Sequence, residues 1–121
     1  MKIAFLMQCH KNPSQINKLL KVLEHPAVDV FIHIDAKFQN IREKINTKDG
    51  VYILSSDKCI DVQWAQFSQV QATLNLIEEA NRVGRYSHYW LISGQDYPIY
   101  SVKEIVDFME KHEEDNFIDC N

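Results

Sequence analysis

Apolar residues in this chain gather in short runs separated by longer segments of mixed character. Residues 2–8 contain five consecutive apolar side chains, and residues 28–34, 51–54 and 88–93 form further short runs rich in β-branched and aromatic residues. Short apolar runs bounded by turn-forming residues are typical of strands in the interior of a sheet. We therefore predict four strands, and a fifth that opens at residues 117–120.

Between these runs, apolar residues recur at helical spacing. Asn12 suits an N-cap and Pro13 the first helical position, ahead of an amphipathic helix that ends near residues 25–26. A short helix is expected around residues 38–45, a turn at Asp49-Gly50, and the longest helix over residues 64–83. A capping box at Ser101 and Glu104 opens a last helix that reaches about residue 111.

Strands that alternate with helices predict an α/β fold, with a mostly parallel sheet, helices on both faces and right-handed crossovers. A length of 121 residues suits one domain over residues 1–121. The apolar share of 45% and the charged share of 25% are those of a soluble globular protein.

Charge and motif content exclude several classes of function. The formal net charge is -4 and the lysines and arginines are scattered, so no nucleic-acid partner is expected. None of the three glycines belongs to a P-loop sequence. No apolar run approaches the roughly 20 residues of a membrane span and no signal-peptide pattern follows Met1, so we expect a cytoplasmic location, with peripheral attachment to a membrane as the variant. The three cysteines are far apart, which favours reduced thiols.

Candidate chemistry lies where the predicted strands end. Ligands of open α/β sheets bind beyond the carboxyl ends of the strands, near a topological switch point. We expect the polar residues that follow the first, second and fourth strands to share one rim. They are Gln8, Cys9 and His10; Asp35 and Lys37; and Ser93, Gln95 and Asp96.

These residue types suit a nucleotide. Asp35 can accept a hydrogen bond from a base N–H or a ribose hydroxyl, Trp64 can stack on the base, and Lys37 can supply positive charge near phosphate. Each has a structural alternative: Asp35 as a helix cap, Trp64 as core packing, His10 as a hydrogen-bonded structural histidine and Asp96 as a turn residue.

A zinc site is a further alternative, because Cys9, His10, His33 and Asp35 follow or end neighbouring predicted strands and are competent ligands. Their spacing matches no standard zinc site, and a histidine such as His33 is more often a structural, hydrogen-bonded residue than a ligand. We therefore expect no metal site.

Four separated blocks stand in the order and spacing of one known family. They are residues 3–10 (IAFLMQCH) followed by Leu19-Leu20; residues 32–37 (IHIDAK); residues 62–64 (VQW) leading into residues 68–72 (SQVQA); and residues 91–99 (LISGQDYPI). Together they resemble the core-2/I-branching β-1,6-N-acetylglucosaminyltransferases, a family that also includes protein xylosyltransferases. The last block is the most specific, and the blocks span nearly the whole chain.

The resemblance implies a GT-A-like (Rossmann-like) nucleotide-sugar-binding fold. It also implies transfer, with inversion, from a UDP-sugar such as UDP-GlcNAc or UDP-xylose to an acceptor hydroxyl of a glycan or another molecule, without a metal cofactor. By matched position, Asp35 and Trp64 would contact uracil, the backbone at Cys9 and His10 would border the nucleotide, and Gln95-Asp96 would line the donor-sugar side. An Asp-x-Asp motif is missing after the fourth predicted strand, which agrees with metal independence.

Two departures from the family pattern matter. Ala65 stands where the family often has glycine, and the family's general base and diphosphate-neutralising basic residues lie beyond the position of Asn121. No catalytic residue is therefore assigned in this chain, and alone it is expected to bind UDP weakly without turnover. A sheet face or edge that a missing part would cover could favour dimers.

A non-catalytic nucleotide-binding or receiver-like α/β module is the alternative function, because it has the same size and element order. A receiver should carry paired acidic residues after its first strand and a lysine after its last. Those places hold Gln8-Cys9-His10 and Cys120-Asn121. The residues therefore favour the transferase interpretation.

Overall fold

The computed structural model describes residues 2–62 and 66–93, which form four strands, two α-helices and two 3-10 helices. In chain order these are β1 (Ile3–Cys9), α1 (Pro13–Val22), β2 (Val28–Ile34), η1 (Ala36–Lys44), β3 (Val51–Ile53), η2 (Ser56–Lys58), α2 (Gln66–Val83) and β4 (His88–Ser93). The predicted helix at 101–111 and strand at 117–120 lie outside the described residues.

The four strands form one parallel sheet in the order β3-β2-β1-β4. Gln8 near the end of β1 pairs with His33 of β2 on one side and with Ser93 of β4 on the other. The chain winds outward from β1 to β2 and β3, then crosses back to place β4 on the far side of β1. The topological switch point therefore lies between β1 and β4.

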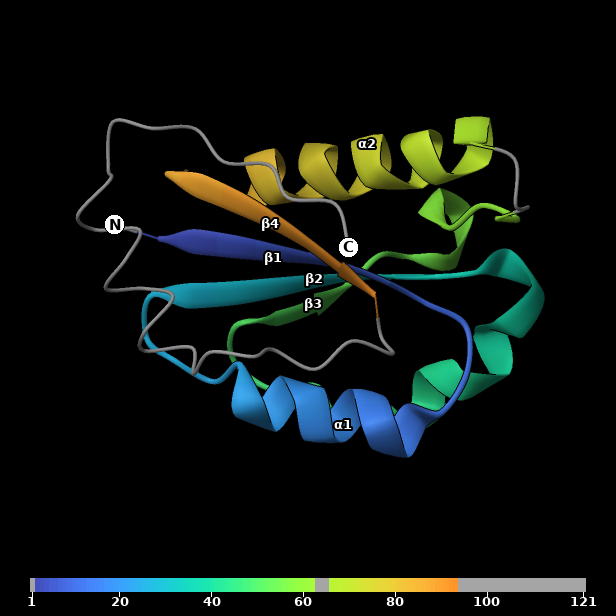
Figure 1. Ribbon diagram of the computed structural model, residues 1–121, viewed down its shortest axis with the longest axis horizontal. Coiled ribbons are helices and arrows are strands. Elements are labelled where there is room, and N and C mark those ends of the chain that lie inside the picture. Colours follow the sequence, from blue (N-terminus) through green and yellow to red (C-terminus); the bar gives the residue numbers. More distant parts are fainter. Residues whose placement is uncertain (1, 63–65, 94–121) are drawn as a thin grey trace.

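The sheet is covered on both faces, with α1 on one side and α2 on the other (Figure 1). Because successive strand residues point to opposite faces, each strand supplies two cores. Ile3, Phe5 and Met7 of β1 belong to the core on the α1 side, whereas Ala4 and Leu6 belong to the core on the α2 side. This explains why the strands read as continuous apolar runs, and it confirms the predicted α/β architecture.

Two local details differ from expectation. Asn12 is the N-cap of α1, but its side chain makes no capping hydrogen bond, and its backbone is left-handed (φ 56°, ψ 64°). Its carbonyl accepts instead from the backbone N–H groups of Gln15 and Ile16. The short helix predicted at 38–45 is a 3-10 segment that begins at Ala36 and is interrupted at Phe38 (φ -128°, ψ 34°).

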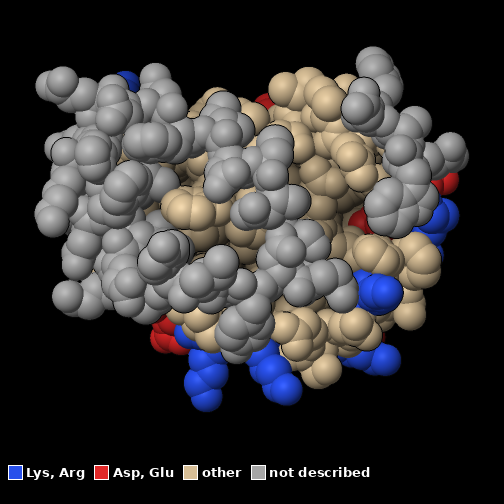
Figure 2. Space-filling model, viewed as in Figure 1, with Lys and Arg blue, Asp and Glu red and all other residues tan. Residues whose placement is uncertain are grey.

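Outside the grey atoms of Figure 2, the described lysines and arginines visible on this face stand separately, mostly along its margins. This matches their scatter along the sequence. Among the described helices, none combines the length and apolar character that crossing a membrane requires.

Candidate functional site

The carboxyl ends of β1 and β2 are joined directly. The backbone N–H of Asp35 donates to the carbonyl oxygen of Cys9 over 3.0 Å. The ring of His10 lies 5.7 Å, centroid to centroid, from that of Phe38 in η1, at an angle of 54°. Three of the residues selected from sequence, Cys9, His10 and Asp35, thus share one rim of the sheet.

Asp35 is the N-cap of η1. Its Oδ1 accepts from the backbone N–H of Lys37 at 3.0 Å, and its Oδ2 lies 3.3 Å from the Lys37 ammonium. The alternative interpretation of Asp35 as a helix cap is therefore confirmed. Its side chain is only 9% exposed, but an ionised carboxylate has about four lone-pair positions, so acceptor capacity remains for a ligand at the rim.

The Lys37 ammonium is bound by three neighbouring residues. Its Nζ donates to the Asp61 carboxylate and to the carbonyl oxygen of Val62 at 2.9 Å, and it forms an ion pair with Asp35. The hydrogen bond with Asp61, followed by that with Asp35, raises the pKa of Lys37 above its usual value. Two carboxylates surround one ammonium, so a phosphate group would have to replace one of these partners.

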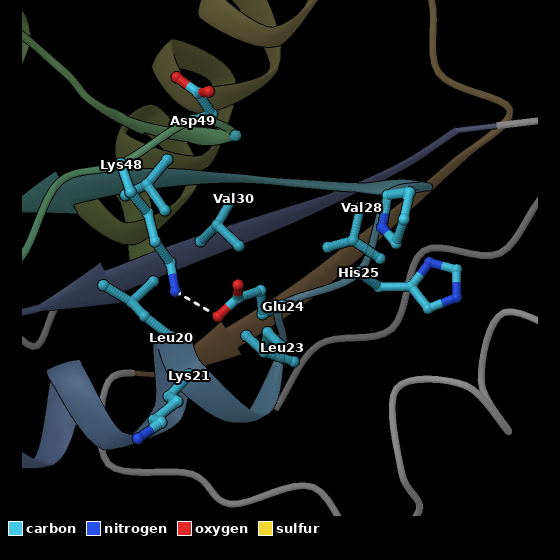
Figure 3. Close-up of a pocket in the computed structure, with 12 residues that line it drawn as sticks. Leu20, Lys21, Leu23, Glu24, His25, Val28, Val30, Lys48 and Asp49 are labelled. Carbon is cyan, nitrogen blue, oxygen red and sulfur yellow. Dashed lines mark hydrogen bonds and ion pairs between the residues drawn. The ribbon is translucent and has the colours of Figure 1, made fainter.

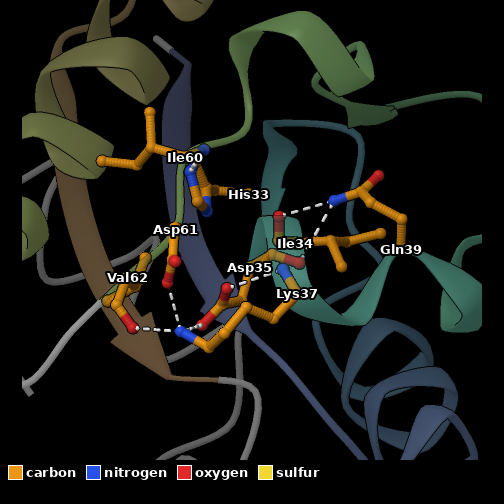
Figure 4. Close-up of polar contacts among 8 residues, drawn as sticks. All are labelled: His33, Ile34, Asp35, Lys37, Gln39, Ile60, Asp61 and Val62. Atoms are coloured by element: carbon orange, nitrogen blue, oxygen red, sulfur yellow. Dashed lines mark hydrogen bonds and ion pairs between the residues drawn. The ribbon is translucent and has the colours of Figure 1, made fainter.

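Residues 60–62, called the strap below, lie across the carboxyl end of β2 (Figure 4). The N–H of Ile60 donates to Nε2 of His33 at 3.0 Å, and its carbonyl accepts from the N–H of Ala36 at 3.0 Å. Lys37 holds the far end of the strap through Val62. The strap leads along the chain towards Trp64, whose predicted stacking role lies outside the described residues.

Sequence reasoning did not select the strap. The sequence feature that points to it is Asp61, a carboxylate directly before the block that contains Trp64. His33, by contrast, was given a structural, hydrogen-bonded role as one interpretation, and its bond to Ile60 confirms it.

His33 is fully buried, at 0% exposure. Because Nε2 accepts a hydrogen bond, the proton of the neutral ring is assigned to Nδ1. Burial lowers the pKa of His33, and its own backbone and the charge of Asp35 oppose that shift only in part. The imidazole is therefore neutral at pH 7 and acts as an acceptor.

Gln8 ties the end of β1 to α2, since its Nε2 donates to Thr73 Oγ1 at 2.9 Å and to the carbonyl of Gln69 at 3.2 Å. Ser93 is its register partner on β4, so both residues lie at the same edge of the sheet.

The Cys9 thiol is not available to a ligand, because it is buried in the core on the α1 side. Burial, and then the charge of Cys59, raise the pKa of this thiol to about 12. Only the Cys9 backbone can serve the rim.

Two further predicted positions, Gln95 and Asp96, lie outside the described residues, as does Trp64. Their place at the rim remains a prediction. Within residues 2–62 and 66–93, no three His, Cys, Asp or Glu side chains come together as a metal-binding group. The alternative of a zinc site on Cys9, His10, His33 and Asp35 thus has no support in this part of the chain.

A pocket of about 630 Å³ lies elsewhere, at the amino ends of β2 and β3 and beside the end of α1 (Figure 3). It is lined by Val28, Val30 and Val51 and bordered by an ion pair between Lys48 and Glu24 at 2.6 Å. The hydrogen bond from Lys48 lowers the pKa of Glu24. This pocket is at the opposite end of the strands from the rim, so it is separate from the candidate site.

Comparisons with known proteins agree with the geometry. A family profile described as Core-2/I-Branching enzyme matches residues 3–121. Among similar proteins are the probable beta-1,3-galactosyl-O-glycosyl-glycoprotein beta-1,6-N-acetylglucosaminyltransferase 7 of Sus scrofa, 26% identical over 88% of this chain, and the corresponding enzyme 3 of Homo sapiens, 30% identical over 86%. The matched region is 26% and 25% of those proteins, so the chain spans about a quarter of their length. The chain belongs to the Core-2/I-branching enzyme family.

Proposed function

We propose that this chain forms the donor-binding part of an inverting glycosyltransferase, which transfers GlcNAc or a related sugar from a UDP-sugar to an acceptor hydroxyl of a glycan or another molecule. Family membership and the N-acetylglucosaminyltransferase names of the relatives support the sugar. The observation that carries the proposal is the meeting of Cys9, His10 and Asp35 beside the switch point of a parallel sheet.

The sheet order suggests how UDP would lie. The base would sit over the end of β2, where Asp35 offers carboxylate oxygens to a uracil N–H. The ribose and diphosphate would cross the backbone at Cys9 and His10 after β1. The sugar would lie beyond β4, the strand that precedes Gln95 and Asp96. Base and sugar would then be two strand spacings apart, roughly 10 Å.

Charge neutralisation at the diphosphate is assigned to groups outside the rim. Lys37 is held by two carboxylates, and the family resemblance implies basic residues and a general base C-terminal to Asn121. We therefore expect binding of UDP without a metal ion, and no turnover by the 121-residue chain alone.

Titration of UDP into isotopically labelled protein tests the proposal, with Asp35→Asn as the variant. The asparagine keeps an oxygen that can cap η1 but replaces the charged acceptor. Loss of one hydrogen bond to a charged group, about 1.5–3 kcal/mol, should weaken UDP binding roughly 10- to 150-fold. Asp49→Asn is the matched control, because Asp49 is exposed and lines the pocket at the other end of the strands.

The expected result is peak shifts at the rim with a weakened affinity only for Asp35→Asn. Equal affinity of the two variants, or no shift of any peak near Asp35 in the wild-type protein, would refute the proposed function.

A further inference from the structure

We propose that His33 is a positioning residue: as a neutral acceptor it holds the strap at the nucleotide rim, and its protonation releases the strap and weakens nucleotide binding. The part that concerns the nucleotide rests on the proposed function. The part that concerns the strap stands on the geometry around Ile60.

Both backbone groups of Ile60 are bound to the end of β2, its carbonyl by the N–H of Ala36 and its N–H by the His33 ring. A parallel strand would provide a backbone carbonyl for that N–H, but here a side chain takes the place of the carbonyl. The strap thus extends the sheet by one residue, through an acceptor that can be protonated. Within residues 2–62 and 66–93, the other side-chain bonds to the strap come from Lys37, at Asp61 and Val62.

Protonation would reverse the role of Nε2. In the neutral ring it accepts from Ile60, whereas in the imidazolium both nitrogens carry protons, so two donors would face each other. Nδ1 has no hydrogen-bond partner among the groups of residues 2–62 and 66–93. The buried cation would therefore gain no compensating bond unless the ring or the strap moved.

Movement of the strap would reach Asp35 through a short chain of contacts. Release of Ile60 frees Asp61 and Val62, which bind the Lys37 ammonium. Lys37 in turn contacts both oxygens of Asp35, through its backbone N–H and its Nζ. A loosened strap changes the partners of the carboxylate that is proposed to receive the base.

Other ionisable groups lie near His33, and their effects on pH dependence have to be distinguished from its own. Burial lowers the pKa of His33, and Asp35 is the charge that opposes this. The neighbouring elements carry Asp35 after β2, Asp61 on the strap and Cys59 directly before it. Lys58 on η2 and Glu79 on α2 form an ion pair with each other. β1 contributes the uncharged Gln8, the register partner of His33. His10 is the second imidazole of the rim, and a His10 variant separates it from His33.

Amide hydrogen exchange of the 121-residue protein tests the strap without nucleotide. Exchange of the Ile60 amide, corrected for its intrinsic pH dependence, is compared between pH 7.5 and 5.5. The Leu54 amide is the internal reference, because it donates to the carbonyl of Ile32 in the sheet. We expect at least a threefold loss of protection at Ile60 on acidification and no change at Leu54.

The variants are His33→Gln, which offers a neutral amide oxygen at similar reach, and His10→Gln as control. His33→Gln should keep its protection and its UDP affinity at pH 5.5. Relative to His33→Gln, the wild-type protein and His10→Gln should both lose at least threefold more of their own UDP affinity between pH 7.5 and 5.5, which removes the effect of protonating UDP itself. If His33→Gln does not fold, the pH midpoints of the His33 ring and the Ile60 amide resonances in the wild-type protein are compared, and they should coincide.

Unchanged protection of Ile60 at pH 5.5, the same loss in His33→Gln as in the wild-type protein, or different midpoints would overturn the proposal. Loosening of the strap with constant UDP affinity would overturn the positioning role. Absence of UDP binding in every protein would reject the proposed function, and Ile60 exchange would still decide whether His33 holds the strap.

Discussion

The buried carboxylate of Asp29 links the amino ends of three strands, β1, β2 and β4. Its Oδ2 accepts from the hydroxyl of Tyr86 at 2.5 Å and from the ammonium of Lys2 at 3.1 Å, and its side chain is only 8% exposed. Lys2 precedes β1, Asp29 is in β2 and Tyr86 precedes β4. We predict that Tyr86→Phe, which removes one hydroxyl, destabilises the folded protein substantially.

The magnitude follows from what remains after the substitution. The ring keeps its edge-on contact with Phe31, at 5.6 Å between centroids, so little packing is lost. Lys2 stays bound to Asp29, but it is 48% exposed and a pair of this kind contributes about 0–1 kcal/mol. The lost hydrogen bond to a charged acceptor is worth about 1.5–3 kcal/mol, and this is the expected decrease in unfolding free energy.

Urea unfolding followed by circular dichroism measures this decrease, with Tyr52→Phe as control. Tyr52 stacks on Phe31 at 5.0 Å, whereas the described side-chain partners of Asp29 are Lys2 and Tyr86. Burial, and then Asp29, raise the pKa of Tyr86, so its contribution is present below pH 10 and is lost as pH rises through the folded-state pKa. Stability of the wild-type protein should therefore fall above pH 10 more steeply than that of Tyr86→Phe. A decrease below about 0.5 kcal/mol, or identical alkaline slopes, would refute the reasoning.

Two further substitutions test features of the fold. Glu79 is hydrogen-bonded by Arg82, which lowers its pKa to about 2, so Glu79→Gln should cost about 1–3 kcal/mol at pH 7 in urea unfolding, and the difference should vanish as pH falls from 4.5 through 2. Gly50 has φ +85°, and the Cβ of an alanine there would lie 3.3 Å from Oδ1 of Asp29, so Gly50→Ala should cost about 1–2 kcal/mol. Gly84→Ala should cost less in the same assay, because its Cβ would lie 3.8 Å from the Tyr86 hydroxyl, an ordinary contact distance.

The strands were predictable because they are buried on both faces. Residues 28–34 and 88–93 match β2 and β4 residue for residue. The run at 2–8 is shifted from β1 by one residue at each end, and the run at 51–54 exceeds β3 by one residue at its end. The order of the strands was not predictable, because pairing between segments far apart in the chain leaves no periodic signal. The left-handed backbone of Asn12 was not predicted either, because asparagine is common both as an N-cap and in this conformation, and the sequence does not distinguish the two.

The rim was predictable in part. The rule that ligands bind beyond the carboxyl ends of parallel strands selected Cys9, His10, Asp35 and Lys37 among others, and these four lie there, with Lys37 ion-paired to Asp35. The engagement of Lys37 by Asp61 was beyond the sequence, because 24 residues separate them and the contact depends on how the strap crosses β2. The bond from Ile60 to His33, across 27 residues, is of the same kind.

The two ends of the sheet differ in how their polar groups are used, and this separates stability from binding. At the amino ends, Asp29 is buried with two donors fixed on one oxygen. At the carboxyl ends, Asp35 is bound by the neighbouring Lys37, whose side chain is 46% exposed. Folded Tyr86→Phe should accordingly bind UDP within about twofold of the wild-type protein, whereas Asp35→Asn should lose more in UDP binding free energy than in unfolding free energy. If both variants lost affinity in proportion to stability, the rim would be only one more stabilising cluster, and the assignment of nucleotide binding to the switch point would fail.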